Sequence, residues 1–296
     1  MSGLASAPAL RREASRRLRD QAFLVLLAAA TLLGLGLLAG ILATVVWQGS
    51  GVISLEFLTA APRDGGGAGG VLPQIIGTLI LAGTAALVAT PLSLGVALVR
   101  TEAYAGRRAG EALGGLLFLL NGAPSILFGV FGYVLLVKAC GLGLSWLAGG
   151  LILALMIVPT VTVAVVEAIR RVPGERRESA RALGLTRSHE VRAVVLPAAA
   201  RGLVTGLLLG LARAAGETAP ILFTAAVFAG VDWPEGIRNS PVVALPYHIM
   251  NLALDASSPA RLAHARGAAL VLVGLALLLS AAAFLSRRAA HEEGRG

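Results

Sequence analysis

Long apolar stretches alternate with short polar intervals along the whole chain. Each apolar stretch has 20 residues or more, the length that an α-helix needs to cross the hydrocarbon core of a membrane. The stretches that we expect to span the membrane are 21–46, 72–99, 112–137, 146–168, 198–228 and 265–286. The predicted fold class is therefore an all-α polytopic membrane protein with six transmembrane helices.

Prolines fall inside several of these stretches and predict breaks in the helices, because proline lacks an N–H and clashes with the preceding turn. We expect a gentle break at Pro91 and an interruption at Pro159. Near Pro124, the side chains of Asn121 and Ser125 can bond the backbone groups that the proline frees. This third place is either a packing kink or part of the lining of a transport route.

The polar intervals differ in composition. Residues 1–20 form an arginine-rich tail, and the interval 47–71 ends in a glycine cluster that is unsuited to a helix. The segment 229–262 contains an apolar run that is too short to span a membrane, and we expect this run to pack against the rim of the bundle. The remaining intervals are the loops 100–111 and 170–196, a short turn around residues 141–143, and the tail 287–296.

The composition supports a membrane protein and excludes several other classes. Hydrophobic residues make up 56% of the chain, charged residues only 14%, and the mean hydropathy is +0.81, whereas soluble domains carry about 25% charged residues. The single cysteine excludes an intrachain disulfide framework. The chain lacks a phosphate-binding GxxxxGK[ST] motif and metal-ligand spacings, so we expect no catalysis and no cofactor in this chain.

The basic residues are distributed unevenly. Of the 25 lysines and arginines, 18 fall in the two tails and in two alternating loops, five fall on the opposite side, and two lie inside one span. This asymmetry follows the positive-inside rule and predicts that both termini are cytoplasmic. It also accounts for the net charge of +9 without nucleic-acid binding, for which basic and aromatic residues would have to be interleaved.

The loop between the fourth and fifth spans has a specific internal order over residues 173–197. It predicts a short amphipathic helix, a stop at Gly184 and a second helical run that leads to a proline at the start of a span. Ala180 and Leu183 are expected to share an apolar edge, with the arginines facing another way. The pattern positions are Glu178, Ser179, Ala180, Gly184, Leu196 and Pro197.

This pattern resembles the cytoplasmic EAA loop of ABC-importer permeases, in which Glu-Ala-Ala is followed by a spaced Gly and by Ile-x-Leu-Pro. Here Ser179 stands in place of the first Ala and Val194 in place of the Ile. In that family the loop forms a coupling helix that inserts into a cleft of the ATPase. The resemblance implies that residues 170–196 form the coupling loop, with a plain connecting loop as the alternative.

A charge pair lies in the middle of the fifth span. Arg213 and Glu217 are four residues apart, which predicts one helix face and an ion pair, and Thr218 places a hydroxyl beside them. A charge at bilayer depth usually faces the bundle interior or a water-filled route. The pair is either a structural salt bridge or an anion station on the substrate pathway, where a fixed positive charge suits an oxyanion.

The string Ala212 to Thr224, which reads ARAAGETAPILFT, closely resembles the corresponding helix of the PstA-type permeases of bacterial phosphate-specific ABC importers. This resemblance covers residues 55–286 and implies the type I ABC importer permease fold in the bacterial inner membrane. It implies a heterodimer with a homologous second permease subunit, two ATPase subunits that bind ATP and Mg, and an extracytoplasmic phosphate-binding protein. Many of these permeases carry Arg-Thr-Thr where this chain has Val163-Ala164-Val165, so the partner permease is expected to supply further contacts.

Three other functions are compatible with parts of the pattern. An ABC permease for another oxyanion or small solute would share the coupling loop. An ion-coupled secondary transporter could use Glu217 as a proton carrier but would not need the loop pattern. A membrane scaffold would leave the buried charge pair without a role. Co-purification with an ATPase separates the importer from the last two.

Overall fold

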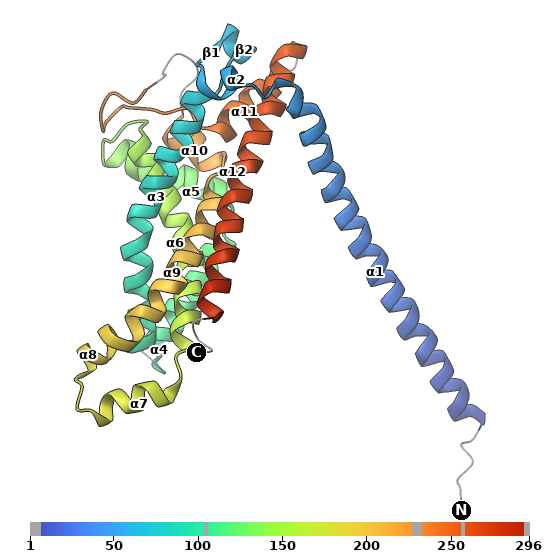
Figure 1. Ribbon diagram of the computed structural model, residues 1–296, viewed down its shortest axis with the longest axis vertical. Helices are drawn as coiled ribbons and strands as arrows, with labels where there is room; N and C mark the ends of the chain where they lie inside the picture. Colours follow the sequence, from blue (N-terminus) through green and yellow to red (C-terminus); the bar gives the residue numbers. More distant parts are fainter. Residues whose placement is uncertain (1–6, 104–105, 227–232, 256–257, 293–296) are drawn as a thin grey trace, which may run out of the picture.

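The computed structural model describes residues 7–103, 106–226, 233–255 and 258–292. It is a helical bundle with a small β-hairpin at one end (Figure 1). The α-helices are α1 (Ala7–Gly49), α2 (Leu55–Thr59), α3 (Leu72–Leu98), α4 (Arg108–Gly122), α5 (Ser125–Gly132), α6 (Trp146–Arg170), α7 (Gly174–Ala182), α8 (Arg187–Glu190), α9 (Leu196–Ala214), α10 (Ala219–Thr224), α11 (Leu245–Leu254) and α12 (Pro259–Glu292). Shorter elements are the strands β1 (Pro62–Arg63) and β2 (Ala68–Gly69), the 3₁₀ turns η1 (Ser50–Val52) and η2 (Asp64–Gly66), and the π-helical turns η3 (Val99–Ala103), η4 (Tyr133–Ala139) and η5 (Val191–Val195).

Helix α6 is the centre of the bundle and packs against α3 and α9. Close contact with α9 is possible because the buried face of α9 consists of small residues, the usual means by which membrane helices approach each other. These residues are Ala198, Ala199, Gly202, Thr205, Gly206, Gly210 and Ala214. Within the described residues, five helices are long and apolar enough to cross a membrane, and the bent pair α4–α5 brings the number to six.

The breaks expected at Pro91 and Pro159 are wrong, because α3 and α6 each continue through their proline. The two helices pack against each other, and close neighbours of this kind let a membrane helix tolerate a proline.

The break expected near Pro124, within the span 112–137, is present and is sharper than a simple kink. Helices α4 and α5 are separated at Ala123 and Pro124 and differ in direction by 97°. Ala123 has ψ of 138°, in the extended region. Proline disfavours the helical conformation for the residue before it, which explains why the chain turns at this point.

The expected fifth span, 198–228, is interrupted. Helical structure begins with α8, passes through η5 into α9 and ends at Ala214, before α10 resumes at Ala219. Pro220 lies in the first turn of α10, where a backbone N–H has no partner within the helix, so the missing N–H of proline costs nothing. In the interior of a helix the missing N–H would remove a hydrogen bond, so Pro220 does not favour a continuation of α9. The predicted end of this span, at residue 228, lies outside the described residues.

Both terminal helices extend into the predicted tails. Helix α1 begins at Ala7, within the interval predicted as the tail 1–20, and α12 continues to Glu292. Helix α1 leaves the bundle at an angle, as Figure 1 shows, and reaches α12 near its own C-terminal end, where Gly49 lies against Arg266. Its membrane-length portion has no buried residues within this chain.

The bundle has two chemically different ends. We call residues 100–103, 106–111 and 170–192 the arginine-rich end, and residues 50–71, 236–255 and 258–262 the cap end. At the cap end the predicted loop 47–71 is more ordered than expected, because Ser54 caps the short helix α2 and the antiparallel strands β1 and β2 pair. Helix α11 is largely buried there, under the β-hairpin.

Candidate transport site and coupling loop

The charge pair lies where helix α9 ends. Arg213 is in the last turn of α9, and Glu217 is in the interruption before α10, so the predicted shared helix face is wrong. The ion pair itself is present, with 3.7 Å between Arg213 Nε and Glu217 Oε1. The chain bends back over one turn to bring the carboxylate to the guanidinium.

Two further polar residues complete the site. Arg213 donates a hydrogen bond of 3.3 Å to Asn121 Oδ1, and the Thr160 hydroxyl donates to the same oxygen at 3.1 Å. Asn121 is in the last turn of α4, at the corner with α5, and Thr160 is in α6. The site therefore joins segments that are distant in the chain, since Asn121 is 92 positions from Arg213 and 39 positions from Thr160.

Arg213 is held loosely. Ion pairs with strong hydrogen bonds between nitrogen and a carboxylate measure about 2.7–2.9 Å, shorter than either contact of Arg213. Its side chain is 39% exposed in the single chain, and that of Glu217 is 17% exposed. A guanidinium in this state keeps donors available for another anion, because it has five N–H groups in a planar fork.

Thr218 is the N-cap residue that precedes α10, but its hydroxyl accepts no hydrogen bond from a backbone N–H of that helix. It is partly exposed next to Glu217. Asn121 could be recognised in the sequence as a polar residue near a proline, whereas Thr160 was missed. The available signal was a hydroxyl directly after Pro159 inside an apolar helix.

The helix, glycine stop and second helical run predicted for the loop are confirmed as α7, Gly184 and α8. Gly184 has φ of +75°, a conformation that costs most residues energy but not glycine. The Leu185 N–H donates to the Ala180 carbonyl at 3.2 Å and the Gly184 N–H to the Arg181 carbonyl at 2.9 Å. These two bonds form a Schellman motif, which ends α7.

The predicted apolar edge of this loop is wrong. Ala180 is buried, but Leu183 is 82% exposed. Arg177 occupies the inner side instead, 21% exposed and paired with Glu102. Arg181 stays 64% exposed while it bonds the buried Glu190. Among the pattern residues Ala180 alone is buried, and the exposed ones are Glu178, Ser179, Gly184, Leu196 and Pro197.

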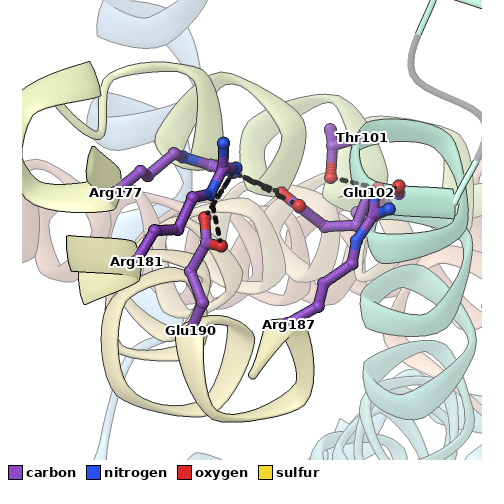
Figure 2. A network of polar contacts seen from close by, with 7 residues as sticks. Thr101, Glu102, Arg177, Arg181, Arg187 and Glu190 are labelled. Atoms are coloured by element: carbon purple, nitrogen blue, oxygen red, sulfur yellow. Dashed lines mark hydrogen bonds and ion pairs between the residues drawn. The ribbon is translucent and has the colours of Figure 1, made fainter. Parts of the chain in front are cut away.

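Ion pairs tie the loop to the bundle, as Figure 2 shows. Arg177 donates to both carboxylate oxygens of Glu102, at 3.1–3.2 Å. Arg181 donates to both oxygens of Glu190, at 3.0 and 3.2 Å, and these hydrogen bonds raise the pKa of Arg181 above its ordinary value. We call Glu102, Arg177, Arg181 and Glu190 the clamp.

Comparison with known proteins identifies the family. The family model described as "Binding-protein-dependent transport system inner membrane component" matches residues 89–291. The chain belongs to this family. This membership means that the chain is a multi-pass protein of the inner membrane and a non-enzymatic component of a transport system. The match runs from the second half of α3 into α12, so it includes Arg213, the clamp and the coupling loop, but not α1.

Two relatives of this permease chain extend the match to most of its length. The chain is 36% identical over 269 residues to "Probable phosphate transport system permease protein PstA" of Methanocaldococcus jannaschii, and the alignment covers 89% of this chain and 92% of the relative. It is 35% identical over 252 residues to "Phosphate transport system permease protein PstA 2" of Mycobacterium bovis, which covers 82% and 81%.

A solved structure supports the permease fold. The chain is similar to a chain in the crystal structure of a bacterial alginate ABC transporter in complex with a periplasmic protein, with a TM-score of 0.63 over 93% of this chain and 96% of that one. The identity is 17%, so this likeness concerns the fold alone. Within the described part of this permease, no group of three His, Cys, Asp or Glu side chains could hold a metal ion.

Proposed function

We propose that this chain is a permease subunit of an ATP-driven ABC importer that moves inorganic phosphate into the cytoplasm. The names of the relatives at 36% and 35% identity support phosphate as the substrate. The site chemistry agrees with this choice, because a guanidinium with free donors suits a tetrahedral oxyanion.

The observation that carries the proposal is the state of Arg213. It lies at the break of a helix, partly exposed, with its carboxylate at 3.7 Å. A purely structural ion pair in an apolar bundle repays its desolvation cost only when its geometry is excellent and further hydrogen bonds satisfy both groups. A transport station must instead attract the ion and release it again. Glu217 lowers the net attraction, and Asn121 with Thr160 fixes the position of the guanidinium.

Arg213 is partly exposed in the single chain, so a substrate pathway along it requires a second protein surface on its exposed side. A homologous second permease subunit would supply it, together with the contacts that the Val163-Ala164-Val165 stretch does not provide. Membrane lipid would cover the remaining apolar faces, such as that of α1.

We further propose that α7 is the coupling helix, that the arginine-rich end is cytoplasmic, and that both termini lie on that side. Two ATPase subunits would dock there and bind ATP and Mg, since this chain has no motif for either. An extracytoplasmic phosphate-binding protein would dock at the cap end. The positive charge of the arginine-rich end supports this orientation.

Reconstitution tests the substrate and the energy source together. The chain is purified with its co-eluting subunits, placed in proteoliposomes with the phosphate-binding protein outside, and supplied with ATP on the ATPase side. We expect uptake of labelled phosphate that requires ATP and is unaffected by excess sulfate. Uptake driven by a pH gradient without ATP would contradict the importer, and equal uptake of sulfate would contradict phosphate as the specific substrate.

Thiol labelling tests the orientation. Single cysteines are introduced at the exposed positions Gly236 and Ser188, with Cys140 changed to serine because Cys140 is itself exposed. In intact cells, an impermeant reagent should label position 236 and leave position 188 unlabelled. The reverse result would invert the orientation.

A further inference from the structure

Helix α3 is tied to the coupling loop at the arginine-rich end. Its continuation η3 carries Glu102, whose carboxylate accepts hydrogen bonds from both terminal guanidinium nitrogens of Arg177 in α7. The Glu102 backbone carbonyl also accepts a bond from Arg187, at the start of α8. The Arg177 and Glu102 side chains are largely buried, at 21% and 14% exposed. Figure 2 shows that both helices of the loop converge on this one glutamate.

The opposite end of α3 is tied to the cap end. The Leu245 N–H donates to the buried Thr78 hydroxyl oxygen at 2.9 Å. One residue earlier, the backbone of α3 at Gly77 lies so close to Val243 that an added Cβ would be 2.2 Å from the Val243 carbonyl oxygen. We call residues 239–245 the cap segment, which also bonds α6, since Ser240 accepts from the Trp146 N–H at 2.9 Å.

Together α3 and η3 form one helix over Leu72–Ala103, and the two ties at Thr78 and Glu102 are about 36 Å apart at the usual rise per residue. This helix is continuous through Pro91 and packs along α6. Other segments are interrupted, because α9 ends at Ala214 and α4 meets α5 at a sharp corner. Helix α6 is also continuous and contacts the cap segment through Trp146, but α3 is the helix that side-chain bonds tie to both the loop and the cap segment. A continuous, packed helix moves as one body, so a displacement at one end reaches the other.

We propose that α3 transmits the conformational signal between the coupling loop and the cap segment, with Glu102 and Thr78 as the positioning residues at its two ends. This inference rests on the proposed coupling role of α7. An extracytoplasmic binding protein that shifts the cap segment would shift α7 through α3, and the ATPase state would act in the reverse direction. Coupling of binding equilibria is reciprocal in this way.

The test uses the complete complex in proteoliposomes and measures ATP hydrolysis with and without phosphate-loaded binding protein. Glu102→Gln removes the charge that holds Arg177 while keeping the side-chain shape. We expect unchanged basal hydrolysis and a stimulated-to-basal ratio lowered by about fivefold or more, the range of typical coupling between sites.

Glu111→Gln is the matched control. Glu111 lines the same polar cavity as Glu102 and Arg177, but it has no ion pair with any residue in the described ranges. The same chemical change at this position should leave the ratio at the wild-type value. A lowered ratio in the control would show a general effect of charge at this surface and overturn the specific role of Glu102.

A double-mutant cycle with Arg177→Gln tests whether the two residues act through each other. If they do, the combined variant lowers the ratio no further than either single variant. Thr78→Val removes the hydrogen-bond acceptor at the far end and should lower the same ratio. A merely structural role would reduce the yield of complex and leave the ratio per complex unchanged, which would overturn the proposal.

Gly184→Pro separates failure of this inference from failure of the proposed function. If that variant removes stimulation while Glu102→Gln and Thr78→Val keep the wild-type ratio, α7 couples but the signal does not pass through α3. If Gly184→Pro also keeps wild-type stimulation, the coupling role of α7 itself is wrong.

Discussion

Two arginine–glutamate sites in this protein use the same chemical groups in opposite ways. In the clamp, Arg181 makes two bonds of 3.0 and 3.2 Å to Glu190, whose side chain is 4% exposed. In the transport site, Arg213 is 3.7 Å from Glu217 and remains partly open. The short, two-point contact fixes one element to another, whereas the contact between Arg213 and Glu217 is long and single. If the proposed function holds, geometry rather than residue type separates a structural tie from a station for an ion.

The largest effect is expected from Arg213→Gln, because it removes the positive charge and leaves Glu217 without its partner. Uptake per assembled complex should fall by about 30-fold or more, because a largely buried carboxylate such as Glu217 that loses its partner costs about 2 kcal/mol or more. Arg213→Lys keeps the charge but loses the planar fork, so partial uptake is expected. Initial rates of labelled phosphate uptake measure both.

The double variant Arg213→Gln with Glu217→Gln then sharpens the comparison. Two amides can bond each other, so a structural pair would tolerate the exchange. A transport station would stay inactive, because no positive charge remains for the anion. Wild-type uptake by the double variant would place this pair with the clamp as a packing element.

The next largest effect is expected at the other site, from Gly184→Pro. Proline has φ near −65° and cannot adopt the +75° that ends α7. The variant should still reach the membrane and should lose stimulated ATP hydrolysis almost completely. Gly184→Asn is the control, since asparagine tolerates the left-handed conformation, and it should keep most of the stimulation.

A smaller effect is expected from Asn121→Ala. Asn121 orients the Arg213 guanidinium but carries no charge. Hydrogen bonds to charged groups are worth about 1.5–3 kcal/mol, so loss of this one bond should reduce uptake by about tenfold or more. The ATPase stimulation by the binding protein should change little. A loss of stimulation equal to that of Gly184→Pro would show that Asn121 serves coupling rather than the anion.

The smallest effect is expected from Glu56→Gln at the cap end. Glu56 is 3.8 Å from Arg63, a distance like that in the transport site, but both side chains are mostly exposed. Exposed ion pairs contribute about 0–1 kcal/mol, so uptake and thermal stability should stay near the wild-type values. A clear loss of uptake would give this pair a role in docking the binding protein.

The loop 173–197 shows what sequence reasoning could predict at a site. The helix, its stop at Gly184 and the second helical run are local features, set by capping and by the φ of one residue. The orientation of this loop could not be predicted, because it depends on Glu102, which lies 75 residues from Arg177. The apolar edge was predicted wrongly for that reason.

The prolines show the same division within the fold. Pro91, Pro124 and Pro159 have the same local chemistry, yet only the chain at Pro124 turns sharply, while α3 and α6 remain continuous. A proline weakens a helix at its position, and the neighbouring helices decide whether it bends. The transport site likewise depends on the corner at Pro124, which brings Asn121 to Arg213.

The sequence by itself determined the membrane class, the approximate positions of the apolar helices, the glycine stop of α7 and the identity of the charged residues in the fifth span. These follow from solvation and short-range sterics, which act within a few residues. The tertiary structure decided the 97° corner between α4 and α5, the break at residues 215–218 and the partners of Arg213 and Glu102. These depend on packing between segments that are distant in the chain, where the contact geometry selects among conformations that the local sequence leaves open.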